Sequence, residues 1–152
     1  MDALPSHVRR ALEADDAEDL GLLLQQRSAQ DFNALRTLLS PDLSVPANVR
    51  SKAIHALGLW GDPVVVPEIA QLTPQLDERG RMSALGALGR LGTPAAEAVV
   101  AAYVDDPSPQ VRKMAVWALG QSGTPEANRK LREVASTDPV EWVREAAARS
   151  TR

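Results

Sequence analysis

The chain has 152 residues, of which 44% are hydrophobic and 24% charged, and its formal net charge is −3. This composition is ordinary for a soluble globular protein. The chain contains no cysteine, which excludes disulfides, zinc ribbons and thiol catalysis. No apolar run approaches the ~18 residues of a membrane span, and no signal-peptide pattern precedes the first helix, so a cytoplasmic location is the default.

The first thirty residues predict two short helices that cap the rest of the chain. Residues 5–14 have an amphipathic pattern, with Pro5 at a first-turn position where proline is tolerated. Residues 15–27 begin with acidic side chains, which suit the positive end of a helix dipole. We interpret this acidic run as a solvated helix start rather than as a metal site.

From residue 31 onward the sequence is periodic. A marker arginine recurs every 31 or 32 residues, at Arg50, Arg81, Arg112 and Arg144. In the first three copies a glycine follows eight residues after the arginine and another follows eleven residues after it. A fixed period of this length is typical of stacked supersecondary units, each of which buries its apolar face on the next.

Each unit predicts two helices. The first helices are expected at 31–40, 64–72, 95–104 and 126–136; Asp31 is the expected N-cap of the first, and an Asp-Pro or Thr-Pro pair starts the others. The second helix of each unit, here called the marker helix, begins near the marker arginine and ends at the glycines. Since no segment alternates like a strand, we expect an all-α fold with nine or ten short helices.

The repeated pattern of Asp-Pro, Val-Arg, Ala and Ala-Leu-Gly resembles the HEAT-repeat superfamily, in its branch of short PBS-lyase-type HEAT-like repeats. This resemblance implies an α-solenoid of stacked antiparallel helix pairs, with the marker helices on its concave side. We expect one domain over residues 1–152. Its parts are an N-terminal cap at 1–30 and four repeats at 31–61, 62–92, 93–123 and 124–152.

Several residues of the repeats have structural roles in this interpretation. In this family the marker arginine usually pairs with a turn aspartate of the same or the adjacent unit. Asp106 with Arg112 and Asp138 with Arg144 have a suitable spacing. Trp60 lies ten residues after a marker arginine, at a register position that looks buried, and is expected in the core. Gly80 replaces the usual valine of the pattern, so we expect its helix to start late or to pack less well.

The concave face carries the candidate binding residues. They lie two residues before, or one, two, five or nine residues after, a marker arginine, and so point away from the core stripe of the marker helix. Basic residues, tryptophan and methionine gather at these positions, and exposed Trp, Met and Arg are enriched at interface centres. The candidates are Lys52, His55, Arg79, Met82, Arg90, Lys113, Met114, Trp117, Gln121, Trp142 and Arg149.

Three hypotheses of function follow. The first is a non-enzymatic scaffold that binds a partner protein or peptide of acidic character on the concave face, with Trp117 as the central anchor. In the alternative interpretation, Trp117 and Trp142 merely fill a shallow core. The second hypothesis is nucleic-acid binding by the basic strip, as in some HEAT-like DNA glycosylases. The third, implied only by the name of the family branch, is a subunit of a bilin lyase.

No catalytic or metal-binding constellation is visible in the sequence. There is no nucleophile–histidine–acid set and no phosphate-binding glycine loop. His55 has no second ligand candidate near it, so we expect no bound metal. Because none of these motifs is present, we also expect no cofactor and no enzyme activity. The oligomeric state is left open.

Overall fold

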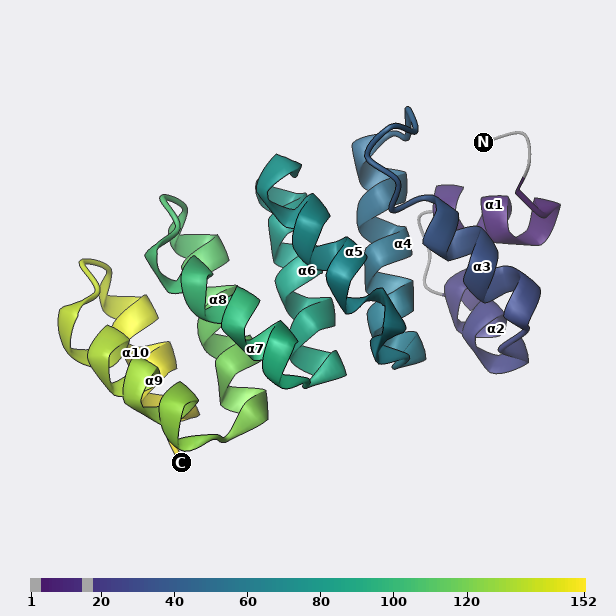
Figure 1. Ribbon diagram of the computed structural model, residues 1–152. Helices are drawn as coiled ribbons and strands as arrows, with labels where there is room; N and C mark the ends of the chain where they lie inside the picture. The colour runs from purple at the N-terminus through teal and green to yellow at the C-terminus, as the bar shows by residue number, and fades with distance from the viewer. Residues whose placement is uncertain (1–3, 15–17) are drawn as a thin grey trace.

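The computed structural model describes residues 4–14 and 18–152, and every regular element in this part of the chain is helical. Figure 1 shows the helices side by side in an elongated array. The described α-helices are α1 (Ser6–Glu13), α2 (Glu18–Gln26), α3 (Ala29–Thr37), α4 (Ala47–Trp60), α5 (Val66–Leu72), α6 (Glu78–Leu91), α7 (Pro94–Ala101), α8 (Pro109–Ser122), α9 (Pro125–Thr137) and α10 (Glu141–Ser150). Short 3-10 turns flank α5 and follow α7. The prediction of an all-α fold with nine or ten short helices is confirmed.

The helices form two layers. The marker helices α4, α6, α8 and α10 form one layer, and α3, α5, α7 and α9 form the other (Figure 1). Helices α1 and α2 pack on each other and on α4 at the N-terminal end of the array. The acidic run that we interpret as solvated comprises Asp15, Asp16, Glu18 and Asp19. These side chains lie outside those that the structure describes. The exact domain boundaries stay a prediction.

The helix ends follow from residues at fixed places in the repeat. The side chains of Asp77, Thr93, Ser108 and Thr124 each accept a hydrogen bond from the backbone N–H three residues later, which caps α6, α7, α8 and α9. At the other end, Gly61, Gly92 and Gly123 have positive φ values of 81°, 63° and 63°. This left-handed conformation terminates α4, α6 and α8 at the second glycine of each repeat.

The core lies between the two layers and runs the length of the array. The predicted core stripe of the marker helices is buried; in α8 it comprises Val111, Ala115, Ala118 and Leu119. Trp60 is also in the core, as expected. The residue is 9% exposed, and its ring lies 5.6 Å from the ring of Phe32 and 5.6 Å from the Arg27 guanidinium, measured from the ring centroid.

The predicted start of α3 is wrong. Ser28, not Asp31, caps this helix, because the Ser28 hydroxyl accepts a hydrogen bond from the Asp31 N–H at 3.0 Å. Asp31 is instead buried in the first turn, and its carboxylate lies 2.8 Å from Nε2 of His7 in α1. The spacing of serine and acid matches a capping box, a signal that would have placed the helix start correctly.

The expectation that Gly80 weakens its marker helix is also wrong. Helix α6 has 14 residues, as do α4 and α8. The Asp77 carboxylate accepts a hydrogen bond from the Gly80 N–H at 2.7 Å and fixes the first turn. A Cβ at Gly80 would lie 2.8 Å from Cβ of Leu76, so the leucine side chain occupies the space of the usual valine.

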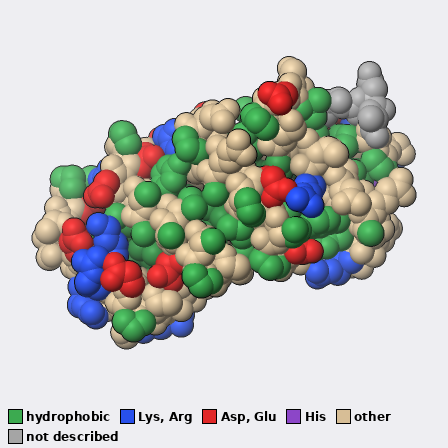
Figure 2. Space-filling model, in the orientation of Figure 1, with side chains coloured by type: hydrophobic (Ala, Val, Ile, Leu, Met, Phe, Trp, Pro, Cys, Tyr) green, Lys and Arg blue, Asp and Glu red, His purple; other side chains and the backbone are tan. Residues whose placement is uncertain are grey.

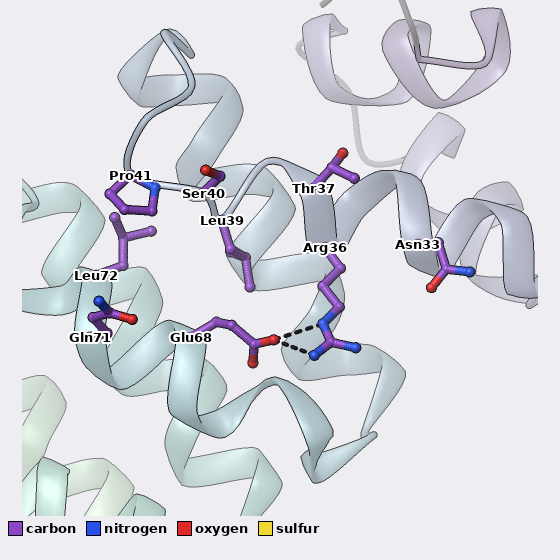
Figure 3. Close-up of a pocket in the computed structure, with 9 residues that line it drawn as sticks. All are labelled: Asn33, Arg36, Thr37, Leu39, Ser40, Pro41, Glu68, Gln71 and Leu72. Atoms are coloured by element: carbon purple, nitrogen blue, oxygen red, sulfur yellow. Dashed lines mark hydrogen bonds and ion pairs between the residues drawn. The ribbon is translucent and has the colours of Figure 1, made fainter.

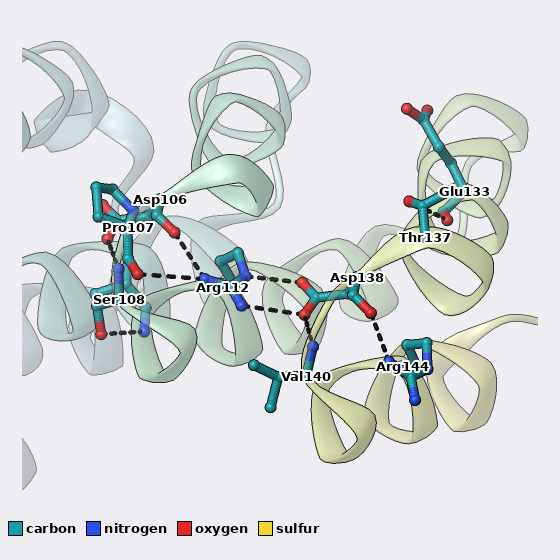
Figure 4. Close-up of polar contacts among 10 residues, drawn as sticks. Asp106, Pro107, Ser108, Arg112, Glu133, Thr137, Asp138, Val140 and Arg144 are labelled. Atoms are coloured by element: carbon teal, nitrogen blue, oxygen red, sulfur yellow. Dashed lines mark hydrogen bonds and ion pairs between the residues drawn. The ribbon is translucent and has the colours of Figure 1, made fainter.

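Two of the four marker arginines, Arg81 and Arg112, tie successive units together, and Figure 4 shows the contact of Arg112. Arg112 donates to the Asp138 carboxylate from Nε at 2.7 Å and from Nη2 at 3.0 Å, and Arg81 lies 3.1 Å from the Asp106 carboxylate. Each carboxylate therefore pairs with the arginine of the preceding unit. Within a unit, Arg112 and Arg144 bind the backbone carbonyls of Asp106 and Asp138. The structural role of these arginines is confirmed, but the same-unit pairing involves backbone oxygens rather than carboxylates.

The outer surface has a different character from the marker-helix surface. Figure 2 shows charged side chains gathered over α9, where Arg129 pairs with Glu126 and Glu133.

Between α3 and α5 lies a pocket of about 350 Å³, shown in Figure 3. Arg36 crosses it to Glu68, with Nε 2.8 Å from the carboxylate oxygen, so the pair connects the first unit to the second.

Candidate partner-binding face

The marker helices approach one another closely because a glycine of one helix faces a small residue of the next. A Cβ at Gly58 would lie 2.6 Å from Cα of Ala87, and a Cβ at Gly89 would lie 2.7 Å from Cβ of Ala118. The helices of the outer layer contact one another far less. The exposed surface of the marker helices is the one that the HEAT-like repeat pattern predicts to be concave, and it is called the concave face below.

One groove of about 350 Å³ lies on the concave face. Helix α6 provides its floor, while α4 and α8 provide its sides. The lining residues are His55, Arg79, Met82, Ser83, Gly86, Arg90, Met114 and Trp117. The groove therefore combines two methionines and a tryptophan with two arginines, across three successive units.

The geometry of α6 sets the length of the groove. Arg79 and Arg90 are eleven residues apart, which is about three helical turns and about 16 Å along the helix axis. Both side chains consequently leave α6 on the same side. Gly86 lies between them, also on this side, and its missing side chain leaves the floor of the groove low. A Cβ there would lie 3.3 Å from Nη1 of Arg90 and 3.8 Å from Sδ of Met114.

Each exposed tryptophan of the concave face lies beside a cation of the preceding marker helix. The Arg90 guanidinium lies 5.3 Å from the ring centroid of Trp117, and Nζ of Lys113 lies 5.6 Å from that of Trp142. Trp117 is 37% exposed and Trp142 is 36% exposed. Each tryptophan thus packs partly on its own array and leaves about a third of its surface to solvent. The sequence allowed two interpretations, an exposed binding residue or a residue that fills a shallow core, and the observed exposure lies between them.

The structure brings six of the eleven candidate residues together in the groove. These are His55, Arg79, Met82, Arg90, Met114 and Trp117. The other five lie outside it. Lys52 donates to the backbone carbonyl of Ala14, Gln121 donates weakly to that of Trp117, and Arg149 lies 3.6 Å from Glu145 on its own helix. Lys113 and Trp142 pair with each other.

Two residues of the groove were expected on the concave face but not among the site residues. Ser83 and Gly86 lie two and five residues after the marker arginine, the same register as Lys52 and His55 in the first unit. Serine and glycine carry neither a charge nor an aromatic ring, so their residue types gave no binding signal. The register itself was the signal that would have included them.

Electrostatics in the groove depend on His55 and Arg90. Burial lowers the pKa of His55 below its ordinary value of 6.5, and the positive charge of Arg90 lowers it further. Both effects favour the neutral form of His55. Arg90 is held in place because its Nη1 donates to the Gly86 carbonyl at 3.1 Å while the guanidinium stays near the Trp117 ring.

Two kinds of feature are absent from the described residues. Among them, no group of three or more histidine, cysteine, aspartate or glutamate side chains has a geometry that could hold a metal ion. Within the same part of the chain, none of the helices combines the length and apolar character needed to cross a bilayer.

Two layers of antiparallel helices that repeat about every 31 residues define an α-solenoid. The sequence comparison then identifies the kind of repeat. A family model of HEAT repeats matches residues 69–152, which is more than half of the chain. The chain therefore belongs to the HEAT-repeat family.

One solved structure agrees on the fold. A chain from the complex of CpcE and CpcF of phycocyanin lyase from Nostoc sp. PCC7120 is similar, with a TM-score of 0.79 and 17% identity over 98% of both chains. At this identity the similarity shows the fold alone. Human deoxyhypusine hydroxylase in complex with glycerol has a TM-score of only 0.33, with 19% identity over 94% of this chain and 81% of the other. A comparison with curated protein sequences gives no match.

The surroundings of the tryptophans predict their response to ionic quenchers. Trp117 and Trp142 are partly exposed beside cations, whereas Trp60 is buried. Because a positive charge attracts anions, iodide is expected to quench the emission of the wild-type protein more strongly than caesium does. Trp117→Phe should remove much of the iodide-quenchable emission, and Trp60→Phe, the matched control, should remove little. Equal loss in the two variants would show that Trp117 is inaccessible to solvent.

Proposed function

We propose that the chain is a non-enzymatic scaffold that binds a partner protein or peptide on its concave face. The groove over α6 is the observation that carries this proposal. It places Met82, Met114 and Trp117 next to the guanidinium groups of Arg79 and Arg90. Methionine, tryptophan and arginine are the residue types enriched at the centres of protein interfaces.

The construction of the array supports this function. The marker helices hold the groove residues on a rigid layer, because glycine-to-alanine contacts join α4 to α6 and α6 to α8. A surface fixed in this way loses little conformational freedom on binding, which favours affinity. The similar fold from Nostoc sp. PCC7120 was solved as a complex of two proteins, CpcE and CpcF. That precedent is consistent with a protein partner for this chain.

Trp117 is the proposed central anchor, and Met114 and Trp142 flank it. The Trp117 ring exposes enough surface for contact, and Arg90 on one side fixes its position. A buried aromatic anchor of this kind contributes on the order of 2 kcal/mol or more to binding. We therefore expect Trp117→Ala to weaken partner binding by about thirtyfold or more.

The nucleic-acid hypothesis has less support. Of the five cations on this face, Lys52 and Arg149 are already engaged by Ala14 and Glu145. Three remaining cations are few for a phosphate track, since affinity for nucleic acid grows with the number of neutralised phosphates. The bilin-lyase hypothesis stays a prediction, and an absorption shift of a bilin mixed with the protein would test it.

A photo-crosslinking experiment tests the proposed function. A photoreactive amino acid replaces either Gln121, exposed on α8 at the concave face, or Arg132, exposed on α9 in the outer layer. Both proteins are irradiated in extracts of the source cells, with and without nuclease. We expect discrete protein adducts from position 121 that persist after nuclease treatment and decrease when Trp117→Ala is added. Equal adducts from both positions, or adducts that nuclease removes, would contradict a protein-binding concave face.

A further inference from the structure

Arg90 places a fixed cation in the middle of the groove. Its Nη1 donates a hydrogen bond to the Gly86 carbonyl at 3.1 Å, so the side chain folds back along α6 toward the preceding turn. The guanidinium lies 5.3 Å from the ring centroid of Trp117, within the range of a cation–π interaction. Contacts from two helices, α6 and α8, therefore hold this guanidinium, although the residue stays exposed to solvent.

Gly86 provides the room for this arrangement. A Cβ at position 86 would lie 3.3 Å from Nη1 of Arg90 and 3.8 Å from Sδ of Met114. Because no side chain grows from this position, the guanidinium can reach the backbone carbonyl. The space over Gly86 is consequently filled by a cation that has a methionine and a tryptophan beside it.

The guanidinium of Arg90 has no acidic partner among the residues that the structure describes. It forms no ion pair with them, and none of the described residues that line the groove is an aspartate or a glutamate. Arg112, by contrast, meets the buried carboxylate of Asp138 in the next unit. Arg90 thus has the fixed position of a structural arginine without the carboxylate that neutralises one.

The chemistry of a held guanidinium favours a carboxylate as its ligand. Arginine has five N–H donors, and the Gly86 carbonyl uses one of them on Arg90. Two of the others can bind a planar carboxylate through parallel, charge-assisted hydrogen bonds. Since the side chain is already held, it loses less freedom on binding than a mobile arginine does. Met82, Met114 and Trp117 provide apolar surface around it.

We propose that Arg90 determines the specificity of the groove by binding one aspartate or glutamate side chain of the partner protein, while an apolar neighbour of that acid packs on Met114 and Trp117. This inference rests on the proposed function and assigns its charge recognition to one residue. Arg79 also lines the groove, but it is exposed, and no hydrogen bond or ion pair to another described residue fixes it. It attracts an acidic segment without selecting it.

The test compares two blocked peptides that differ in one side chain. The first is acetyl-Gly-Leu-Glu-Leu-Gly-amide, and the second has glutamine in place of glutamate, which keeps the shape and removes the charge. Each is titrated into the full chain labelled with nitrogen-15, and binding is followed by nuclear magnetic resonance at pH 7. The signals observed are the indole N–H of Trp117 and the Nε–H of Arg90, which Trp117→Phe and Arg90→Lys assign by their absence.

We expect the glutamate peptide to bind about tenfold more tightly than the glutamine peptide, because only glutamate forms charge-assisted hydrogen bonds with the guanidinium. Arg90→Lys should reduce this preference to about twofold or less, since lysine keeps the charge but lacks the planar pair of N–H groups. Arg79→Lys is the matched control, because it makes the same exchange in the same helix and groove. It should leave the preference unchanged.

The preference is a ratio of two affinities measured on one protein, so a partly unfolded variant lowers both affinities and leaves the ratio unchanged. The proposal is overturned if the wild-type protein binds the two peptides equally, or if neither peptide shifts the Trp117 and Arg90 signals. It is also overturned if Arg90→Lys keeps the preference, or if Arg79→Lys reduces it equally.

Failure of this proposal is distinguishable from failure of the proposed function. Protein adducts from position 121 without a preference for the glutamate peptide would retain the scaffold function and reject Arg90 as its acid-binding residue. Loss of both results would reject the two proposals together.

Discussion

Replacement of Asp138 by asparagine is expected to cost about 3–5 kcal/mol of unfolding free energy, because it leaves the charge of Arg112 buried without its partner. The Arg112 and Asp138 residues are 8% and 7% exposed, and their side chains make two parallel hydrogen bonds of 2.7 and 3.0 Å between α8 and the turn before α10. Urea unfolding monitored by circular dichroism measures this loss as a fall in the transition midpoint.

An exposed ion pair provides the control for Asp138→Asn. Glu126→Gln also removes a carboxylate from an arginine, but Glu126 and Arg129 lie in solvent on α9. We expect little change in stability from it. A double variant, Arg112→Met with Asp138→Leu, should be more stable than Asp138→Asn alone, since no buried charge remains. If Asp138→Asn unfolds at the wild-type urea concentration, the pair does not hold the last two units together.

The same pair predicts how stability depends on pH. Burial raises the pKa of Asp138, but hydrogen bonds from Arg112 and the Val140 N–H and the charges of Arg112 and Arg144 lower it more, so it lies below its ordinary value of 3.8. A carboxyl with a lowered pKa stabilises the fold above its unfolded pKa and loses that contribution as pH falls through its folded pKa. The difference between wild type and Asp138→Asn should therefore be full at pH 6 and decrease below about pH 4.

Alanine at Gly89 is expected to destabilise the protein by about 1–3 kcal/mol, whereas alanine at Gly86 in the same helix is not. At Gly89 the added Cβ would lie 2.7 Å from Cβ and 2.9 Å from Cα of Ala118, so α6 and α8 must separate. At Gly86 the nearest atom is the flexible end of Arg90, at 3.3 Å, and alanine favours the helix by about 0.5–1 kcal/mol.

Thermal unfolding of the two glycine variants separates packing from helix propensity, because both replacements are identical and lie one turn apart. The melting temperature should fall for Gly89→Ala by roughly 2–4 °C per kcal/mol lost. It should rise slightly or stay unchanged for Gly86→Ala. A fall of equal size in both variants would mean that the close approach at Gly89 does not limit the spacing of the marker helices.

Much of the fold and part of the candidate site could be predicted from the sequence. The period of the marker arginines, the glycines at fixed distances and the apolar stripe of each helix predicted a helical repeat array and its core, including Trp60. These signals are local, since 3.6-residue periodicity and capping residues act within one helix. The start of α3 was missed although its capping signal at Ser28 was also local.

Contacts between units could not be predicted, because they depend on how closely two helices pack and on which rotamers meet across the gap. The position of Arg90 beside Trp117, and of Lys113 beside Trp142, joins successive marker helices. The pairing of Arg112 with Asp138, rather than with the aspartate of its own unit, is of the same kind.

The sequence by itself determined a stack of helix pairs with a basic, aromatic concave face. Only the tertiary structure decided that six candidate residues share one groove over Gly86, since their assembly follows from the spacing of three separate helices.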